Sequence, residues 1–282
     1  MNVIYWEINE HSNNLKGMEN SNLELSIDYA LRFVKTYESI ISKIQFSEEC
    51  QIKGEGIELG AGFGVMSSVL SKLENVGKIT CIEYSKNLLE NIMPLIFQRL
   101  EANIEKIERI RGSFNHLEFN NNTFDFAIET LAFHHADAPY KPISEAYRVL
   151  RRGGVLIMIE RAVSNRTTDD TIETSLNTHL GKRHLLRYNF PVDMKITRAE
   201  WGEHDLRFID WMYILNKVGF EVKLFKSFYL KKRILNKLFK SFYKLSGIGD
   251  LIFKKQLTYF PLYDYYSVSR RAGNAIFICK KL

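Results

Sequence analysis

The sequence has little cysteine and no long apolar run. Only three cysteines occur among 282 residues, Cys50, Cys81 and Cys279, too few and too scattered for a disulfide framework or a zinc site of paired cysteines. No stretch of about 18 or more apolar residues occurs, and acidic residues such as Glu7 and Glu10 stand where a signal peptide needs an apolar segment. These absences predict a cytoplasmic protein that neither spans a membrane nor carries that secretion signal.

The chain is rich in apolar residues and has an excess of positive charge. Apolar residues make up 45% of it and aromatic residues 13%, enough for a substantial core, and the net charge is +6. Residues 222–256 hold ten Lys or Arg and one acidic residue, and residues 231–245 have the spacing of a basic amphipathic helix. Three interpretations of this helix stay open: a lid packed on the core, a surface that attracts an anionic substrate, and peripheral contact with an anionic membrane at its inner face.

The N-terminal part, residues 1–53, predicts a helical cap. Ser21 and Glu24 have the spacing of a capping box, and apolar residues from Ile27 to Ile44 recur at helical intervals. One helix is therefore expected over residues 21–46.

From residue 54 onward, short apolar segments alternate with helical ones. A helix is expected from about Tyr140, ending before Gly153, and another over Phe208–Val218, closing at Gly219. This alternation predicts crossover helices and an α/β fold with a seven-stranded, mostly parallel sheet and helices on both faces. The expected strands are Gly56–Leu59, Lys78–Tyr84, Ile107–Arg111, Thr123–Thr130, Val155–Glu160, Phe220–Leu230 and Ala275–Lys280.

The domain organisation follows from this pattern. Residues 54–160, 206–230 and 273–282 form the core, and two stretches fall outside the alternation, 161–205 and 231–272. We expect both insertions to form a lid over the carboxyl edge of the sheet, where open α/β folds bind ligands.

The most specific motif is Glu-Leu-Gly-Ala-Gly-Phe-Gly at residues 58–64, between a short strand and a helical segment. Glycines there allow positive φ and let a ligand approach the backbone. A dinucleotide-binding fingerprint needs a third glycine at position 65, which is Val65. Nineteen residues beyond Gly64, Glu83 ends the next strand and can accept hydrogen bonds from ribose hydroxyls.

These motifs resemble those of the class I S-adenosylmethionine-dependent methyltransferases, and so do Arg-Gly-Ser-Phe at 111–114, Phe-Asp-Phe-Ala-Ile-Glu at 124–129 and residues 146–154. The resemblance implies a Rossmann-like sheet, S-adenosyl-L-methionine as methyl donor and S-adenosyl-L-homocysteine as product. Ser113 departs from the family pattern, because many members carry Asp there to accept a bond from the adenine amino group. The donor-binding residues implied are Glu58, Gly60, Gly62, Gly64, Glu83, Tyr84, Ser113, Phe114 and Glu129.

The family places groups that face the methyl donor after the fourth expected strand, at residues 129–135. No Asn/Asp-Pro-Pro-aromatic motif and no cysteine occur there, which argues against methylation of an adenine amino group or of cytosine carbon 5. Imidazole titrates near neutral pH, so a histidine is the first candidate for a general base. The catalytic candidates are His134, His135, Glu160 and His204.

A structural role is the alternative for each of these residues. His134 or His135 can serve only to order its loop, Glu160 can form a surface ion pair with Arg161, and the cluster around His204 can cap a helix. No metal site is expected there, because consecutive residues of a regular helix or strand cannot converge on one ion.

The first insertion is rich in arginine, and Arg161, Arg183 and Arg187 are the candidates for substrate binding. They favour a small or medium-sized acceptor with phosphate or carboxylate, methylated on oxygen, such as a sugar phosphate, nucleotide sugar or surface-glycan precursor. Two alternatives remain: an RNA or protein methyltransferase that docks through its basic C-terminal region, although nucleic acid is the less favoured partner, and a non-catalytic binding module. The oligomeric state cannot be deduced from the sequence.

Overall fold

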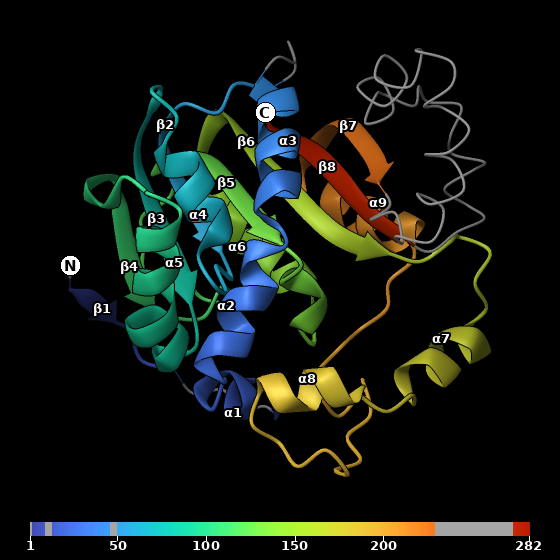
Figure 1. Cartoon of the computed structure of the whole chain (residues 1–282). Helices are drawn as coiled ribbons and strands as arrows, with labels where there is room; N and C mark the ends of the chain where they lie inside the picture. Colours follow the sequence, from blue (N-terminus) through green and yellow to red (C-terminus); the bar gives the residue numbers. More distant parts are fainter. Residues whose placement is uncertain (1, 9–12, 46–49, 229–272) are drawn as a thin grey trace, which may run out of the picture.

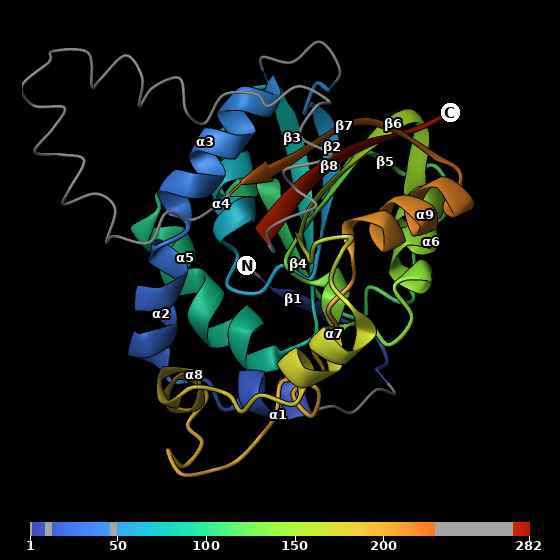
Figure 2. The same cartoon turned by 90° about the vertical axis from the view of Figure 1, so that its right-hand side faces the viewer.

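The protein is built around an eight-stranded sheet in a computed structural model that describes residues 2–8, 13–45, 50–228 and 273–282. Figure 2 shows helices α2 to α5 on one face of this sheet and α6 and α9 on the other. The strands are β1 (Val3–Tyr5), β2 (Gly54–Leu59), β3 (Val76–Glu83), β4 (Ile107–Arg111), β5 (Phe124–Thr130), β6 (Leu150–Ala162), β7 (Phe220–Phe228) and β8 (Gly273–Lys281).

The α-helices are α1 (Asn13–Glu19), α2 (Leu23–Leu31), α3 (Val34–Gln45), α4 (Val65–Ser71), α5 (Met93–Arg99), α6 (Tyr140–Val149), α7 (Asp169–Leu176), α8 (Lys182–Arg187) and α9 (Phe208–Val218). A π-helical turn, Leu88–Ile92, leads into α5, and 3-10 turns cover Ile104–Lys106 and Phe133–His135. None of the helices in these parts of the chain is long and apolar enough to cross a membrane.

The strands follow the order β1-β4-β3-β2-β5-β6-β8-β7 (Figure 1). Neighbouring strands from β1 to β6 are parallel, and β8 runs antiparallel to both β6 and β7. All seven expected strands are present, which confirms the α/β fold and the mostly parallel sheet. The eighth strand, β1, was not expected: it has only three residues, which are exposed or half-buried, so it shows no apolar alternation.

The core lies on both faces of the central strands. Within β5, Phe126 and Ile128 belong to the apolar cluster beneath α3 to α5, whereas Phe124 and Ala127 belong to the cluster beneath α6 and α9. Successive side chains of a strand point to opposite faces, and central parallel strands are covered on both. This explains why β5 contains three consecutive apolar residues, Phe126, Ala127 and Ile128.

The N-terminal cap differs from the single helix expected over residues 21–46. The α-helical ladder breaks at Arg32 and Phe33, whose N–H groups bond three residues back, and α3 begins after them. The expected capping box is also wrong: Asn22 is the N-cap and accepts from the Leu25 N–H at 3.0 Å, while the Ser21 hydroxyl donates to the Met18 carbonyl at 2.8 Å. Ser21 and Asn22 are adjacent and both residue types can cap a helix, and the sequence pattern pointed to Ser21 in place of Asn22.

The first insertion, residues 161–205, contains α7 and α8, and α8 lies beside the N-terminal helices α1 and α2 (Figure 1). The Asn22 N–H donates to the Arg187 carbonyl at 2.6 Å, so the two segments are tied together. The second insertion and the basic helix expected within it fall outside the described residues.

Candidate active site

The sheet topology places a crevice between the carboxyl ends of β2 and β5. From β2 the chain adds β3 and β4 on one side, then crosses to β5 on the other side of β2. Loops diverge at such a switch point, which is where open α/β sheets bind ligands. A cavity of about 700 Å³ lies there, within the usual range of about 300–1,000 Å³ for ligand pockets. Its walls come from the loops after β2, β3, β4 and β5, the N-terminal helices and the first insertion.

The loop after β2 uses its three glycines in different ways. Gly60, Gly62 and Gly64 have φ of +72°, +53° and +75°. A Cβ at Gly60 would lie 2.5 Å from the Ala132 Cβ, and one at Gly64 would lie 2.6 Å from the Phe97 ring, whereas one at Gly62 would meet no protein atom within 4 Å. Gly60 and Gly64 thus permit close packing, and Gly62 lies open to the cavity. Gly64 itself does not line the cavity.

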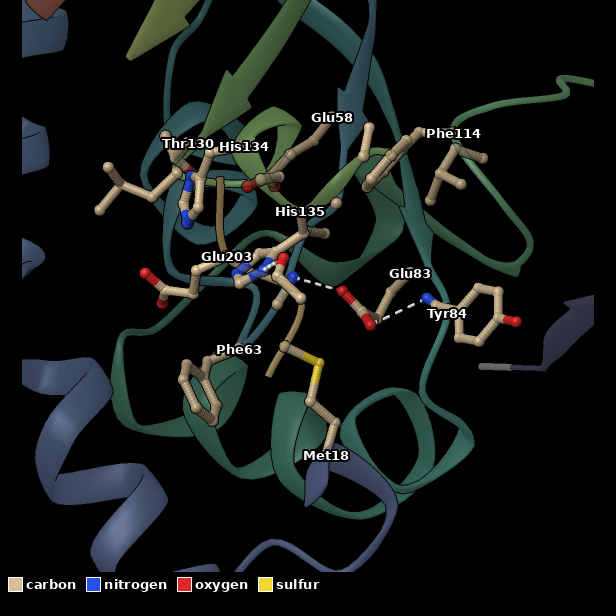
Figure 3. A pocket seen from close by; sticks show the side chains of 18 of the residues that line it. Met18, Glu58, Phe63, Glu83, Tyr84, Phe114, Thr130, His134, His135 and Glu203 are labelled. Carbon is tan, nitrogen blue, oxygen red and sulfur yellow. Dashed lines mark hydrogen bonds between the residues drawn. The ribbon is translucent and has the colours of Figure 1, made fainter. Parts of the chain in front are cut away.

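Glu83, at the end of β3, lines the cavity next to Tyr84 (Figure 3). Its carboxylate accepts from the N–H groups of Gly62 at 2.7 Å, Tyr84 at 2.8 Å and Ser85 at 2.9 Å. A carboxylate has about four acceptor positions, so about one stays open to a ligand hydroxyl. Burial raises the pKa of this carboxyl to about 7, although the three N–H donors oppose the rise.

Glu58, at the end of β2, is fully buried and lines the same cavity. Its Oε2 accepts from the Ser67 hydroxyl, and within the described chain its Oε1 has no hydrogen-bond partner. Burial raises the pKa of this carboxyl to about 8. An unsatisfied buried acceptor costs about 1–3 kcal/mol, so a ligand that brings a hydrogen-bond donor would be stabilised here.

Residues from the loops after β3 and β4 form a further part of the cavity wall, next to Glu83. Tyr84, Ser113 and Phe114 all line it. The Ser113 hydroxyl accepts from the Asn115 N–H at 3.1 Å, and the Phe114 ring packs edge-on against Phe133. The predicted adenine contacts therefore stand together on one wall.

His134 and Glu160 form a buried pair beside the loop after β5. Nδ1 of His134 lies 2.6 Å from Oε1 of Glu160, a separation at which Nδ1–H donates to the carboxylate. The backbone N–H groups of His134 and Arg161 donate to the same carboxylate at 3.1 and 2.6 Å. Glu160 does not line the cavity, whereas His134 does, so Glu160 acts through His134.

His135 also lines the cavity, and its Nδ1 lies 2.9 Å from the Gly202 carbonyl oxygen. Burial lowers the pKa of His135 to about 3, so its imidazole is neutral. His204 is placed differently from the expectation: it does not line the cavity, and its Nδ1 lies 2.9 Å from the His134 carbonyl oxygen. Its position makes it a support of the loop that carries His134.

Glu129 lies behind the cavity lining and holds the loop after β5. It is fully buried, and its Oε2 accepts from the N–H groups of Ala132 at 2.9 Å and Phe133 at 3.4 Å. Burial, together with the neighbouring Glu160 carboxyl, raises the pKa of Glu129 well above its usual range. Glu129 was expected to bind the donor, but it lies outside the cavity lining and holds the loop after β5 from behind.

The three arginines expected to bind substrate have different surroundings. Arg161 lines the cavity but forms ion pairs with Glu203 at 2.6 Å and Asp205 at 2.7 Å, so its charge is compensated within the protein. Arg183 is exposed and lies outside the cavity lining. Arg187 lines the cavity, with its guanidinium 3.3 Å above the Tyr29 ring centroid.

Several lining residues could not be identified from the sequence. Their shared feature is that they come from the N-terminal helices or the first insertion and reach the cavity only through tertiary packing. The main ones are Met18, Tyr29, Tyr37, Tyr188, Trp201 and Glu203. Trp201 packs against Tyr188 with ring centroids 4.9 Å apart, so the two form a rigid aromatic wall. The sequence marked Trp201 and Glu203 only as part of the polar cluster around His204, and no local motif marked the other four residues.

One known family model matches the part of the chain that includes the glycine-rich loop and β5. Residues 57–158 match the family model described as "Methyltransferase domain". A glycine/sarcosine/dimethylglycine N-methyltransferase of Actinopolyspora halophila is 25% identical over 183 residues, 65% of this chain and 30% of that protein. A demethylmenaquinone methyltransferase of Staphylococcus epidermidis is 29% identical over 84 residues, 30% of this chain and 33% of that protein. The match thus spans about a third of these relatives.

Among solved structures, the [4+2]-cyclase SpnF has a TM-score of 0.56 at 17% identity, covering 86% of this chain and 80% of that one. This likeness shows the fold alone. The family match shows that residues 57–158 form a domain of the class I S-adenosylmethionine-dependent methyltransferase type, and S-adenosylmethionine is the methyl donor of that domain.

Proposed function

We propose that this protein transfers a methyl group from S-adenosylmethionine to an oxygen atom of a small or medium-sized anionic molecule. One observation carries the proposal: a single cavity joins the open Gly62 and Glu83 at one end to His134, backed by Glu160, at the other. A candidate donor site and a candidate proton acceptor therefore share one cavity.

The donor end fits S-adenosylmethionine. Gly62 leaves room for the ligand to approach the backbone closely. The remaining acceptor position of Glu83 suits one ribose hydroxyl. The Oε1 atom of Glu58, which has no partner in the described chain, suits a hydrogen-bond donor on the methionine part of the ligand. Tyr84, Ser113 and Phe114 would hold the adenine. When bound, S-adenosylmethionine supplies a methyl group already activated on sulfonium, which leaves S-adenosylhomocysteine behind.

At the acceptor end, the chain has to orient the attacking oxygen and take its proton. As the new O–CH₃ bond forms and the S–CH₃ bond breaks, the hydroxyl proton passes to His134. The Glu160 carboxylate, 2.6 Å from Nδ1, fixes the ring orientation and stabilises the imidazolium that results. Glu160 is therefore a positioning residue in this proposal.

Arg187 supports an anionic acceptor, because its guanidinium lines the cavity and no carboxylate of the described chain pairs with it. A sugar phosphate, a nucleotide sugar or a surface-glycan precursor has the required charge. The name of the relative from A. halophila supports a second candidate, an amino acid methylated on nitrogen, since glycine also brings a carboxylate.

Donor affinity is expected to rise with pH through about 7, and this rise should come from Glu83. With a pKa of about 7, roughly a tenth of this carboxyl is ionised at pH 6 and roughly nine tenths at pH 8. Only the ionised carboxylate can accept hydrogen bonds at both oxygens. A ligand hydroxyl therefore binds the ionised form of Glu83 better than the protonated form. Calorimetric titration with S-adenosylmethionine from pH 6 to 8 measures this.

The matched control is Glu83→Gln, which removes the titrating group and keeps the shape. It should bind the donor about 10- to 100-fold more weakly, as expected for one lost charge-assisted hydrogen bond of about 1.5–3 kcal/mol. Its affinity should not follow the pH profile of the wild type. Parallel profiles in both proteins would assign the pH dependence to another group.

Recognition of the acceptor is expected to depend on Arg187. Arg187→Met should raise the acceptor KM at least about 10-fold and change kcat less, because one charge-assisted bond to the bound anion is lost. Arg183→Met is the matched control, since Arg183 lies on the same helix but outside the cavity lining. Equal effects of both substitutions on KM would remove Arg187 from the acceptor site.

The acceptor itself can be found without a prior guess. The protein is incubated with S-adenosylmethionine and fractionated metabolite pools, and release of S-adenosylhomocysteine is followed by mass spectrometry. Release only with fractions of small anionic molecules supports the proposal. Release only with RNA or protein fractions would replace it by a macromolecular methyltransferase.

A further inference from the structure

We infer that His134, His135 and Glu203 form a binding site for one divalent transition-metal ion. One donor atom from each of these three side chains lies within 4.8 Å of the other two. All three residues line the cavity, and Figure 3 shows them beside one another at its acceptor end. They come from the 3-10 turn after β5 and from the end of the first insertion, which explains why the sequence predicted no metal.

The two imidazoles are held in the way that metal ligands are held. Metal-binding histidines almost always donate their other ring N–H to a carboxylate or a carbonyl, which fixes the tautomer and the ring orientation. Nδ1 of His134 lies 2.6 Å from the Glu160 carboxylate, and Nδ1 of His135 lies 2.9 Å from the Gly202 carbonyl oxygen. Nε2 is then the coordinating nitrogen of each ring.

Glu203 supplies the carboxylate. Its Oε2 accepts from Arg161 at 2.6 Å and from Arg198 at 3.1 Å, so Oε1 is the oxygen for the ion. The positive charges of the Arg161 and Arg198 guanidinium groups are compensated by the carboxylates of Glu203 and Asp205. Asp205 lies 2.7 Å from each guanidinium group. The buried Glu160 adds a further carboxyl behind His134, so the surroundings do not oppose a cation.

Donors bound at about 2.0–2.1 Å in tetrahedral geometry stand roughly 3.3 Å apart. One donor atom of each side chain lies within 4.8 Å of the other two, so the three residues can share one ion after a small movement of their side chains. Two imidazole nitrogens and one carboxylate oxygen suit Zn²⁺, Fe²⁺, Co²⁺ or Mn²⁺ better than Mg²⁺ or Ca²⁺, which prefer oxygen. Three protein ligands also leave a coordination position open on the ion.

An acceptor hydroxyl at that open position would ionise near neutral pH, because a bound divalent cation lowers the pKa of a coordinated oxygen. With the ion bound, the coordinated hydroxyl would release its proton to solvent and the histidines would act as ligands, whereas in the metal-free protein His134 takes the proton. This consequence rests on the proposed function, whereas the metal site itself does not. Metal binding is therefore measured without donor or acceptor, so that failure of one proposal is not failure of the other.

The test uses the full chain, treated with a chelator and then titrated with Co²⁺ by visible absorption and with Zn²⁺ by calorimetry. We expect one ion per chain. His135→Ala and Glu203→Gln should each weaken Zn²⁺ binding at least about 10- to 100-fold, while His179→Ala, an exposed histidine outside the cluster, should bind as the wild type does. Absence of stoichiometric binding, or binding that neither substitution weakens, would overturn the inference.

X-ray absorption of the Zn²⁺-loaded wild type gives a second measurement that does not depend on how the variants fold. Scattering from two imidazole ligands, with nitrogen and oxygen donors at about 2.0–2.2 Å, is the expected result. A shell with sulfur or without imidazole would place the ion elsewhere and refute the site.

Discussion

Replacement of Gly62 by valine is expected to weaken binding of S-adenosylmethionine up to about 100-fold and leave the fold intact. A Cβ at this position meets no protein atom within 4 Å, so the added side chain would project into the cavity instead of into the core. Overpacking costs about 1–3 kcal/mol, which at its upper end is roughly a hundredfold in affinity. Calorimetry measures the affinity, and thermal unfolding shows that the variant is folded.

The matched control is Gly153→Val. Gly153 also has a positive φ, +78°, and open space around its Cβ position, but it lies near the start of β6, at the opposite edge of the sheet from the cavity. Both substitutions place a β-branched residue in the left-handed region, at a cost of about 1–3 kcal/mol of stability. Only Gly62→Val should lose donor binding, and retention of wild-type affinity by it would show that the donor binds elsewhere.

Substitution of His134 by glutamine is expected to lower turnover at least about 100-fold with donor affinity nearly unchanged. The amide of glutamine can still donate a hydrogen bond to Glu160, but it cannot take a proton, and loss of a general base typically costs about 10²–10⁴ in rate. His135→Ala is expected to act in the same direction, because His135 lines the same end of the cavity. Turnover and calorimetry on the same preparations separate the two effects.

His179→Ala is the control for this pair, since His179 is exposed and outside the cavity lining. Donor binding lost in parallel with turnover would assign the two histidines a structural role. Full activity in both variants would show that neither histidine takes the proton. The proposed role of Glu160, which is to position His134, would then fail as well.

The residues proposed to bind the donor could be placed together from the sequence because their pattern is local. Glycines at 60, 62 and 64 and the carboxylate at Glu83 lie at the ends of neighbouring strands, and the strand pattern alone brings them together. The same pattern found every strand except β1, whose three residues carry no alternation. It could not show that backbone N–H groups already occupy most of the Glu83 carboxylate.

The acceptor half depends on contacts between segments far apart in the sequence. Glu203 reaches His135 only because the first insertion folds back over the loop after β5, and Tyr29 reaches Arg187 only because α8 packs beside α2. The compensation of Arg161 by Asp205 has the same origin. Charge in the sequence indicated an anion site, but only the fold shows that Arg187 both lines the cavity and has no carboxylate partner in the described chain.

The most direct test of the central claim is a calorimetric titration of the wild-type chain with S-adenosylmethionine and, separately, with NAD. The account predicts one donor site per chain with micromolar affinity for S-adenosylmethionine and much weaker binding of NAD, because Val65 replaces the third glycine of a dinucleotide site. No binding of S-adenosylmethionine, or preferential binding of NAD, would contradict it.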